Sequence, residues 1–272
     1  MFATDRSMNV VDLARAAEER GFFSLYLPEH THIPTSRTTP APTGDAELPE
    51  EYRRTIDPFV ALGAAAAVTS KLIIGTGICL VAQRDPILLA KETATLDLYS
   101  SGRLVLGIGF GWNREEMAHH GVEFRTRRAM VREKMLAVKR LWSEDRAAFA
   151  GDFVNFEESW SWPKPVQKPH PPVLIGGAAG PKMFAHVAEY ADGWIPIGGA
   201  GVAKALPELR AALEKVDRDP AQVRVVPFGT LPKPDKLEYY SSLGIEEVVL
   251  RIPSASADVV LPLLDRYQGF LY

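Results

Sequence analysis

The sequence predicts an α/β fold of the (β/α)8 (TIM) barrel class, and three observations support this prediction. Apolar runs of strand length, rich in Val, Ile and Leu, alternate with longer segments of helical period along nearly the whole chain. Such alternation is typical of a parallel sheet covered by helices. The length of 272 residues suits one barrel-sized domain spanning residues 1–272. Residues with unusual chemistry follow the strands, where the active sites of such barrels lie.

The helices are predicted from apolar periodicity and capping residues. In residues 8–20 the apolar side chains recur on one face, and Gly21 is a typical C-terminal cap. Asp57 followed by Pro58 is a typical start for the next helix, which ends near residue 70. Further helices are expected over 86–99, 126–142 and 181–190. Two more follow the strands at 193–197 and 223–228 and end near residues 217 and 243, and a last one lies near the C-terminus.

Short apolar segments between these helices are predicted to be parallel strands. Seven are expected, over residues 23–27, 72–80, 103–109, 173–175, 193–197, 223–228 and 247–252. No strand precedes the first helix, whereas an eight-stranded barrel requires one there. We therefore expect the first strand to be truncated or missing, which would leave an open sheet edge.

Residues 144–172 depart from the alternating pattern. The segment follows the third predicted strand and its helix, which form the fourth strand–helix unit if the missing first strand is included. The segment is rich in Trp and Pro, and its GDFVNFEES stretch can pair as a hairpin. We expect an insertion lying over the barrel rather than a second domain. The polar loop through residues 31–49 is longer than a plain connection requires, so both segments are expected to shape a substrate pocket.

Composition argues against several classes of function. The 31 Lys and Arg residues against 34 Asp and Glu give a formal charge of −3, without the basic surplus typical of nucleic-acid binding. The single cysteine, Cys79, excludes an intramolecular disulfide. No segment has the length of a membrane span or the pattern of a signal peptide. These features predict a cytoplasmic protein without nucleic-acid or membrane partners.

The first candidate site follows the strand at 23–27. Glu29 and His30 stand there, and the pKa of an imidazole suits acid–base catalysis near neutral pH. His30 with His32 also matches the start of a binuclear metal site, but the other predicted strand ends carry no further ligands. We therefore expect no metal, and we assign Glu29 and His30 as candidate catalytic residues. An ordinary polar loop is the alternative interpretation.

Glycines form three further clusters at or near strand ends. Those in the strand at 72–80 indicate either close approach of a flat ligand to the backbone or glycines required by packing in a crowded barrel. Glycines that precede a helix can also expose backbone N–H groups to an anion. The candidate cofactor-binding residues are Thr76, Gly77, Ile78, Gly109, Phe110, Gly111, Trp112, Gly176, Gly177 and Ala178. The motifs of serine hydrolases, P-loop proteins and zincins are absent from the sequence.

Longer motifs carry a resemblance to a known family. The stretch DLARAAEERGF is followed by LYLPEH, then by QRDP, SGR and GIGFGWN, and PKPVQ leads through IGG to ADGW. In these motifs the chain resembles the bacterial luciferase-like flavin and deazaflavin oxidoreductases, which are (β/α)8 barrels. The short chain and the Glu29–His30 pair are most similar to the branch that depends on coenzyme F420, a deazaflavin.

The resemblance implies an oxidoreductase that transfers a hydride between coenzyme F420 and a small organic substrate. His30 would then donate or accept a proton beside the deazaflavin, and Gly77 with Ile78 would form a bulge, often with a cis peptide, behind the ring. Residues 109–112 would line the ring and tail, and Gly176 with Gly177 would offer N–H groups to the phosphate. The family also implies a homodimer.

Two alternatives stay open from the sequence. One is an FMN-dependent monooxygenase that uses dioxygen, because neither His30 nor the glycine clusters distinguish a flavin from a deazaflavin. The other is a non-catalytic flavin-binding barrel, in which His30 would have no chemical function. No motif in the sequence identifies the substrate.

Overall fold

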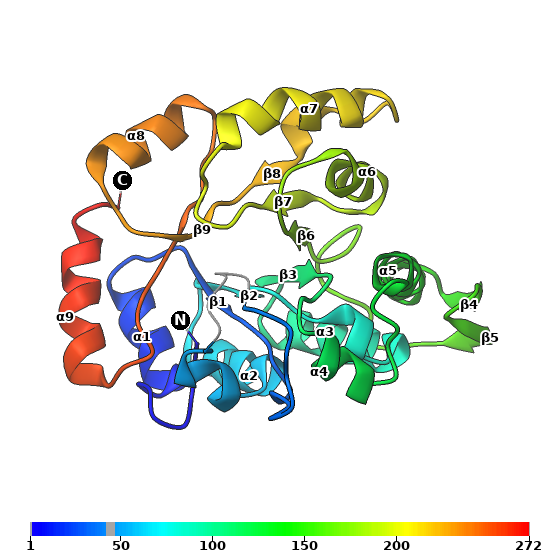
Figure 1. Ribbon diagram of the computed structural model, residues 1–272, viewed down its shortest axis with the longest axis horizontal. Helices are drawn as coiled ribbons and strands as arrows, with labels where there is room; N and C mark the ends of the chain where they lie inside the picture. The colour runs from blue at the N-terminus through cyan, green and yellow to red at the C-terminus, as the bar shows by residue number, and fades with distance from the viewer. Residues whose placement is uncertain (1, 42–46, 272) are drawn as a thin grey trace.

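In the computed structural model, which describes residues 2–41 and 47–271, helices and strands alternate along the chain (Figure 1). The helices are α1 (Val10–Glu19), α2 (Pro58–Val68), α3 (Pro86–Tyr99), α4 (Arg114–His119), α5 (Arg127–Ser143), α6 (Pro181–Tyr190), α7 (Val202–Glu214), α8 (Pro234–Ser242) and α9 (Ala257–Gln268). The strands are β1 (Ser24–Leu27), β2 (Ile73–Thr76), β3 (Leu104–Gly109), β4 (Arg146–Ala150), β5 (Asn155–Trp160), β6 (Val173–Gly176), β7 (Gly193–Ile195), β8 (Arg224–Val225), β9 (Phe228–Thr230) and β10 (Val249–Leu250). Short 3₁₀ helices are η1 (Glu50–Arg54), η2 (Val81–Gln83) and η3 (Pro220–Gln222).

Most of the predicted elements are confirmed, and the differences have local causes. Helices α3 and α6 have the predicted bounds. The predicted strand at 72–80 ends at Thr76, because the chain bends at the next two residues. The predicted strand at 223–228 is divided into β8 and β9 on either side of Pro227, which has no N–H group for a ladder. Helix α4 begins after the glycine cluster at 107–113, where a helix was expected, but its bounds were not predicted, since six residues are too few for a periodic pattern.

Six strands form one parallel sheet in the order β1-β2-β3-β6-β7-β8. Strands β9 and β10 pair in parallel with each other, and a single bridge between Ile197 and Phe228 connects them to the larger sheet. Figure 1 shows the sheet curled, with helices along its outer side. Because the strands run in parallel, their carboxyl ends gather at one edge, where the loops that carry the candidate residues begin.

The curled sheet does not close into a barrel within residues 2–41 and 47–271. No strand pairing joins β1 to β10, and a cavity of about 1010 Å³, lined by Tyr26 and Val249 among others, separates them. Residues 2–9 contain no strand, and Thr4 makes only an isolated bridge to Thr55. The described strands therefore form an open, half-barrel sheet. Residues 42–46 of the predicted pocket loop lie outside the described residues.

The hairpin predicted within residues 144–172 is present, but its position differs from the prediction. Strands β4 and β5 pair in antiparallel orientation, and β4 packs against α5. Figure 1 shows the hairpin projecting outward beyond α5, away from the centre of the sheet. The expectation that this insertion lies over the barrel is therefore wrong, because the apolar face available to the hairpin belongs to the outer helix α5.

The apolar core fills the space between the sheet and the helices. Trp142 on α5 is 1% exposed, and its indole N–H donates to the carbonyl oxygen of Ala90 at 3.2 Å. Helices α2 and α3 each begin with an Asp–Pro pair, in which Asp57 accepts from the Val60 N–H and Asp85 from the Leu88 N–H. Such caps typically stabilise a helix by about 1 kcal/mol.

The loop after β1 is held against α4 by one carboxylate. Glu115 accepts hydrogen bonds from the backbone N–H and hydroxyl groups of Thr38 and Thr39, at 2.7 to 3.1 Å. Burial alone would raise the pKa of Glu115, but the bonds from Thr39 and Thr38 outweigh it and lower the pKa to about 2. A carboxylate whose pKa is lowered by folding stabilises the folded state above its unfolded pKa.

We predict that Glu115→Gln lowers the free energy of unfolding at pH 7 by about 1–2 kcal/mol, because the amide replaces an ionised acceptor. The folded pKa lies below the unfolded one, so this stabilisation is present above about pH 4.5 and is lost as pH falls toward 2. Urea unfolding of wild type and variant should show the difference shrinking between pH 7 and pH 2.5. Glu157→Gln, on the exposed hairpin, is the control. A difference that is equal at both pH values would contradict the prediction.

Candidate functional site

His30 lies shortly after β1, at the carboxyl edge of the sheet, and one nitrogen of its ring contacts Glu116. The Nδ1 atom of His30 is 2.8 Å from Oε2 of Glu116, and the two side chains are 7% and 1% exposed. Nε2 of His30 makes no hydrogen bond with any residue in 2–41 or 47–271. One ring nitrogen is therefore held by a carboxylate while the other is available to a ligand.

Two aromatic side chains flank the imidazole. The ring of Trp112 meets the His30 ring edge-on at a centroid distance of 5.6 Å, and the Tyr52 ring lies 5.4 Å away. Burial raises the pKa of Tyr52, so its phenol stays neutral at physiological pH. These residues make the surroundings of His30 largely apolar, which limits access of water to the ring. Trp112 was predicted as a site residue, whereas Tyr52 was not.

Glu116 was missed by the sequence analysis because its pattern has a common structural explanation. Asn113 caps α4, and its side chain accepts from the Glu116 N–H at 3.3 Å. An Asn followed three residues later by Glu is a typical capping-box pattern, in which the Glu returns to the cap. Here the carboxylate instead accepts from the Thr31 N–H at 3.1 Å and contacts His30. Only the folded chain shows this second partner.

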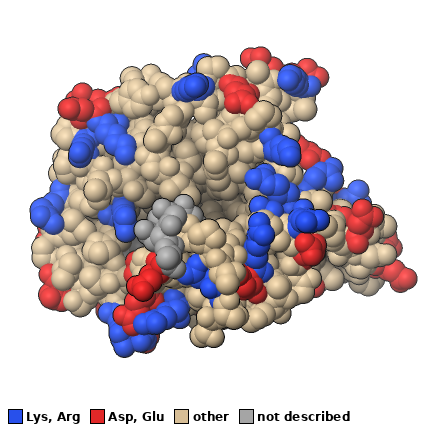
Figure 2. All heavy atoms as spheres, in the orientation of Figure 1, with Lys and Arg blue, Asp and Glu red and all other residues tan. Residues whose placement is uncertain are grey.

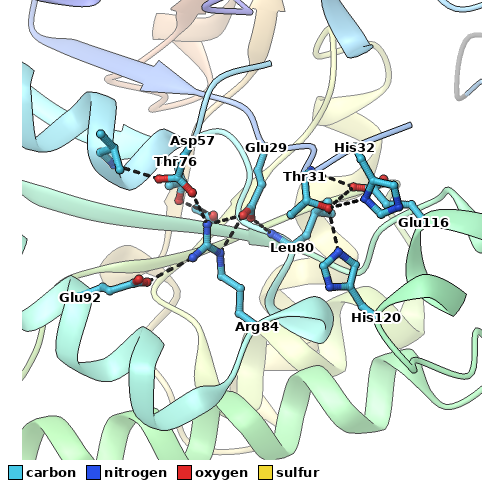
Figure 3. Close-up of polar contacts among 12 residues, drawn as sticks. Glu29, Thr31, His32, Asp57, Thr76, Leu80, Arg84, Glu92, Glu116 and His120 are labelled. Carbon is cyan, nitrogen blue, oxygen red and sulfur yellow. Dashed lines mark hydrogen bonds and ion pairs between the residues drawn. The ribbon is translucent and has the colours of Figure 1, made fainter. Parts of the chain in front are cut away.

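Glu29, the other candidate catalytic residue, has both carboxylate oxygens bound within the fold. One of its oxygens accepts from the Leu80 N–H at 2.6 Å, and the other accepts from Nε of Arg84 at 2.7 Å. Figure 3 shows Arg84 between Glu29, Asp57 and Glu92. Both oxygens of Glu29 are thus bound within the fold, and this residue anchors the end of β1.

The peptide bond between Gly77 and Ile78, just after β2, is cis, as the family resemblance implied. A Cβ atom on Gly109 would lie 2.6 Å from the Ile78 side chain, and one on Gly176 would lie 2.9 Å from it. These two glycines therefore make room for Ile78. Within the strand at 72–80, where packing was one of the two interpretations, a Cβ atom on Gly75 would lie 2.4 Å from the Tyr26 ring and one on Gly77 2.5 Å from the Phe228 ring.

Several other predicted cofactor contacts are already used by the sheet. The Thr76 hydroxyl donates to the Gly107 carbonyl at 2.7 Å, and the Gly177 N–H donates to the Ile195 carbonyl at 3.2 Å. The expectation that Gly177 offers its N–H to a phosphate is therefore corrected. Ala178 is exposed just before α6, and its N–H donates to no described residue.

A cluster of arginines lies beside Phe110. Arg128 stacks over the Phe110 ring at 4.4 Å, and its Nη1 atom is buried without a hydrogen-bond partner among the described residues. Burial, followed by the charges of Arg128 and Arg114, lowers the pKa of Arg127. Figure 2 shows a hollow near the centre of this face, with Lys and Arg side chains along one side. An unpaired, buried guanidinium favours an anionic ligand group.

These features fit a flavin or deazaflavin cofactor, which combines a flat ring with a phosphate. The aromatic walls and Ile78 suit the ring, and the unpartnered Arg128 nitrogen suits the anion. In the part of the chain that the structure describes, no group of three or more His, Cys, Asp or Glu side chains is arranged to hold a metal ion. Burial raises the pKa of the Cys79 thiol, so it is not ionised. No helix within the described ranges has the length and hydropathy of a membrane span.

Comparison with known proteins identifies relatives over the whole chain. An uncharacterized protein of Mycobacterium tuberculosis is 44% identical over 277 residues, covering 100% of this chain and 96% of the relative. The F420-dependent glucose-6-phosphate dehydrogenase of Kineococcus radiotolerans is 32% identical over 222 residues, covering 79% of this chain and 60% of that enzyme.

Solved structures share the fold at low sequence identity. A monooxygenase from Streptomyces bottropensis superposes with a TM-score of 0.77 at 21% identity, covering 97% of this chain and 92% of that one. An F420-dependent secondary alcohol dehydrogenase, solved with an F420-acetone adduct, gives a TM-score of 0.65 at 19% identity, with 96% and 77% coverage. Residues 3–232 match the family described as luciferase-like monooxygenase, and the chain therefore belongs to that family.

Proposed function

We propose that the protein is an oxidoreductase that transfers a hydride between coenzyme F420 and a small organic substrate, with His30 as the proton donor or acceptor. The observation that carries this proposal is the buried His30–Glu116 pair, which leaves Nε2 of His30 without a partner among the described residues. The similarity to F420-dependent dehydrogenases, at 32% and 28% identity, supports the choice of cofactor.

When bound, coenzyme F420 supplies two-electron hydride chemistry at a ring carbon. In a reduction, Nε2 of His30 would give its proton to the carbonyl oxygen, or to one carbon of an activated C=C bond, while the neighbouring carbon receives the hydride. In the reverse direction it would take the hydroxyl proton of an alcohol whose carbon loses the hydride. Glu116 fixes the orientation of the His30 ring through the contact with Nδ1. Trp112 and Tyr52 limit water at Nε2, and Arg128 binds the phosphate.

An FMN-dependent monooxygenase is the second candidate. It is favoured by the description of the matching family and by the similarity in fold to the monooxygenase from Streptomyces bottropensis. The same aromatic walls and arginine would hold FMN, because the two cofactors share a ring and a phosphate. The affinities of the protein for coenzyme F420 and for FMN therefore distinguish the two candidate functions.

We predict that the purified protein binds coenzyme F420 at least tenfold more tightly than FMN, a difference of about 1.4 kcal/mol. Titrations of both cofactors, followed by tryptophan fluorescence, measure this ratio, because Trp112 lies at the expected ring site. Tighter binding of FMN, together with consumption of dioxygen by the reduced complex, would favour the monooxygenase instead.

We predict that His30→Gln lowers kcat by about 10²- to 10³-fold, because the amide cannot exchange a proton at neutral pH. The rate is measured from the absorbance of F420 with a substrate found by screening activated alkenes, ketones and alcohols. The control is His170→Gln, at a histidine that packs near Trp142 and not at the site. Wild-type kcat in the His30 variant, with the same substrate, would exclude the proposed role.

A further inference from the structure

Four of the six histidines lie together around the end of β1 and the end of α4. His30 and His32 belong to the loop after β1, whereas His119 and His120 stand at the C-terminal end of α4. Their contacts meet at Thr31, which lies between the two histidines of the loop (Figure 3). The proposed function uses only His30, so the other three histidines have no assigned role.

Two hydrogen bonds connect the loop to the end of α4 through these histidines. Nε2 of His32 is 2.8 Å from Nδ1 of His119, and the Thr31 hydroxyl is 2.8 Å from Nε2 of His120. The same hydroxyl is 3.0 Å from Nδ1 of His32. We call His32, His119 and His120 the histidine clasp. It joins the loop that carries His30 to the helix that carries Glu116.

The clasp depends on neutral imidazoles. In the arrangement in which the Thr31 hydroxyl donates to Glu116, at 3.4 Å, His32 and His120 both supply N–H groups to its oxygen. Nε2 of neutral His32 then accepts from the Nδ1–H of His119. A bond between two imidazoles survives only while one of them is neutral, because two protonated rings would place two N–H groups face to face.

The electrostatic surroundings favour the neutral form at physiological pH. Burial lowers the pKa of His120, and the charge of His32, when present, lowers it further, as does that of His119. Glu116 and Glu29 oppose this effect. Other charged groups near the clasp are Glu115, which binds the same loop at Thr38, and Arg37, which lies over Trp112.

We propose that the histidine clasp positions His30 against Glu116 and opens when its imidazoles become charged. His32, His119 and His120 are thus positioning residues that act through Thr31, whose N–H also binds Glu116. The consequence for activity rests on the proposed function of His30. The clasp would hold His30 in contact with Glu116 near neutral pH and would release this contact in acid.

The sign of the effect follows from linkage. His120 has a lowered pKa in the folded state, so the folded protein binds fewer protons than the unfolded chain. The contribution of His120 to stability is therefore fully present above about pH 6.5, the unfolded value, and falls as pH drops below it. A protonated His120 still supplies its N–H to Thr31, so the contact that opens in acid is the one between His32 and His119. Glu115 does not titrate in this range, because its pKa lies at about 2.

The experiment measures hydrogen exchange of the Thr31 N–H by NMR in the cofactor-free protein. We expect the protection factor of this amide to fall at least ~10-fold between pH 7.5 and pH 5.5, because opening of the clasp releases its bond to Glu116. In the double variant H119Q/H120Q, whose side chains stay neutral, the protection factor should change less than ~2-fold over the same range. His170→Gln, outside the clasp, should keep the wild-type dependence.

The pH dependence of kcat tests the functional consequence. Both proteins keep His30, so the ratio of the wild-type kcat to the H119Q/H120Q kcat isolates the clasp. We expect this ratio to be at least ~3-fold lower at pH 5.5 than at pH 7.5. A Thr31 protection factor that is independent of pH in the wild type, or equally pH-dependent in the double variant, would overturn the clasp. Because that measurement needs no cofactor or turnover, it is independent of whether the proposed function holds.

Discussion

The buried hydrogen bond between His30 and Glu116 is the contact on which the candidate site depends. Its two partners are 86 residues apart and come from different strand ends, so it forms only when the loop after β1 and helix α4 are both in place. Removing one partner of a buried ionisable pair leaves the other unpaired, which typically costs about 3–5 kcal/mol. The surrounding contacts serve this pair: Glu29 anchors the end of β1 on Arg84, and Asn113 caps the helix that carries Glu116.

A second constraint comes from crowding at the carboxyl edge of the sheet. The chain bends at Gly77 and Ile78, and the Ile78 side chain occupies the space that side chains at 109 and 176 would otherwise take. The glycine clusters thus have a packing cause that is independent of any ligand. They still affect binding indirectly, because they allow an apolar side chain to form the surface that a flat ring would meet.

The sequence predicted the order of elements well because strands and helices differ in apolar period and in their caps. Asp85 before Pro86, for example, located the start of α3. His30 was identified from its place after a strand, and the residues that support it were not. Glu116 resembled a capping residue, and no motif in the sequence connects His119 and His120 with the loop that carries His30. The predicted position of the hairpin was wrong, because a local pairing pattern does not determine which distant surface the hairpin contacts.

The sequence by itself determined the family, the alternation of parallel strands and helices, and the position of an imidazole at a strand end. These properties depend on residues that are close in the chain, so patterns of a few residues are sufficient to predict them. Only the tertiary structure decided which carboxylate serves His30, which glycines accommodate Ile78, and that β1 and β10 are not paired within the described residues. Each of these depends on contacts between segments far apart in sequence, and the free energy of such contacts is set by burial and geometry rather than by local preference.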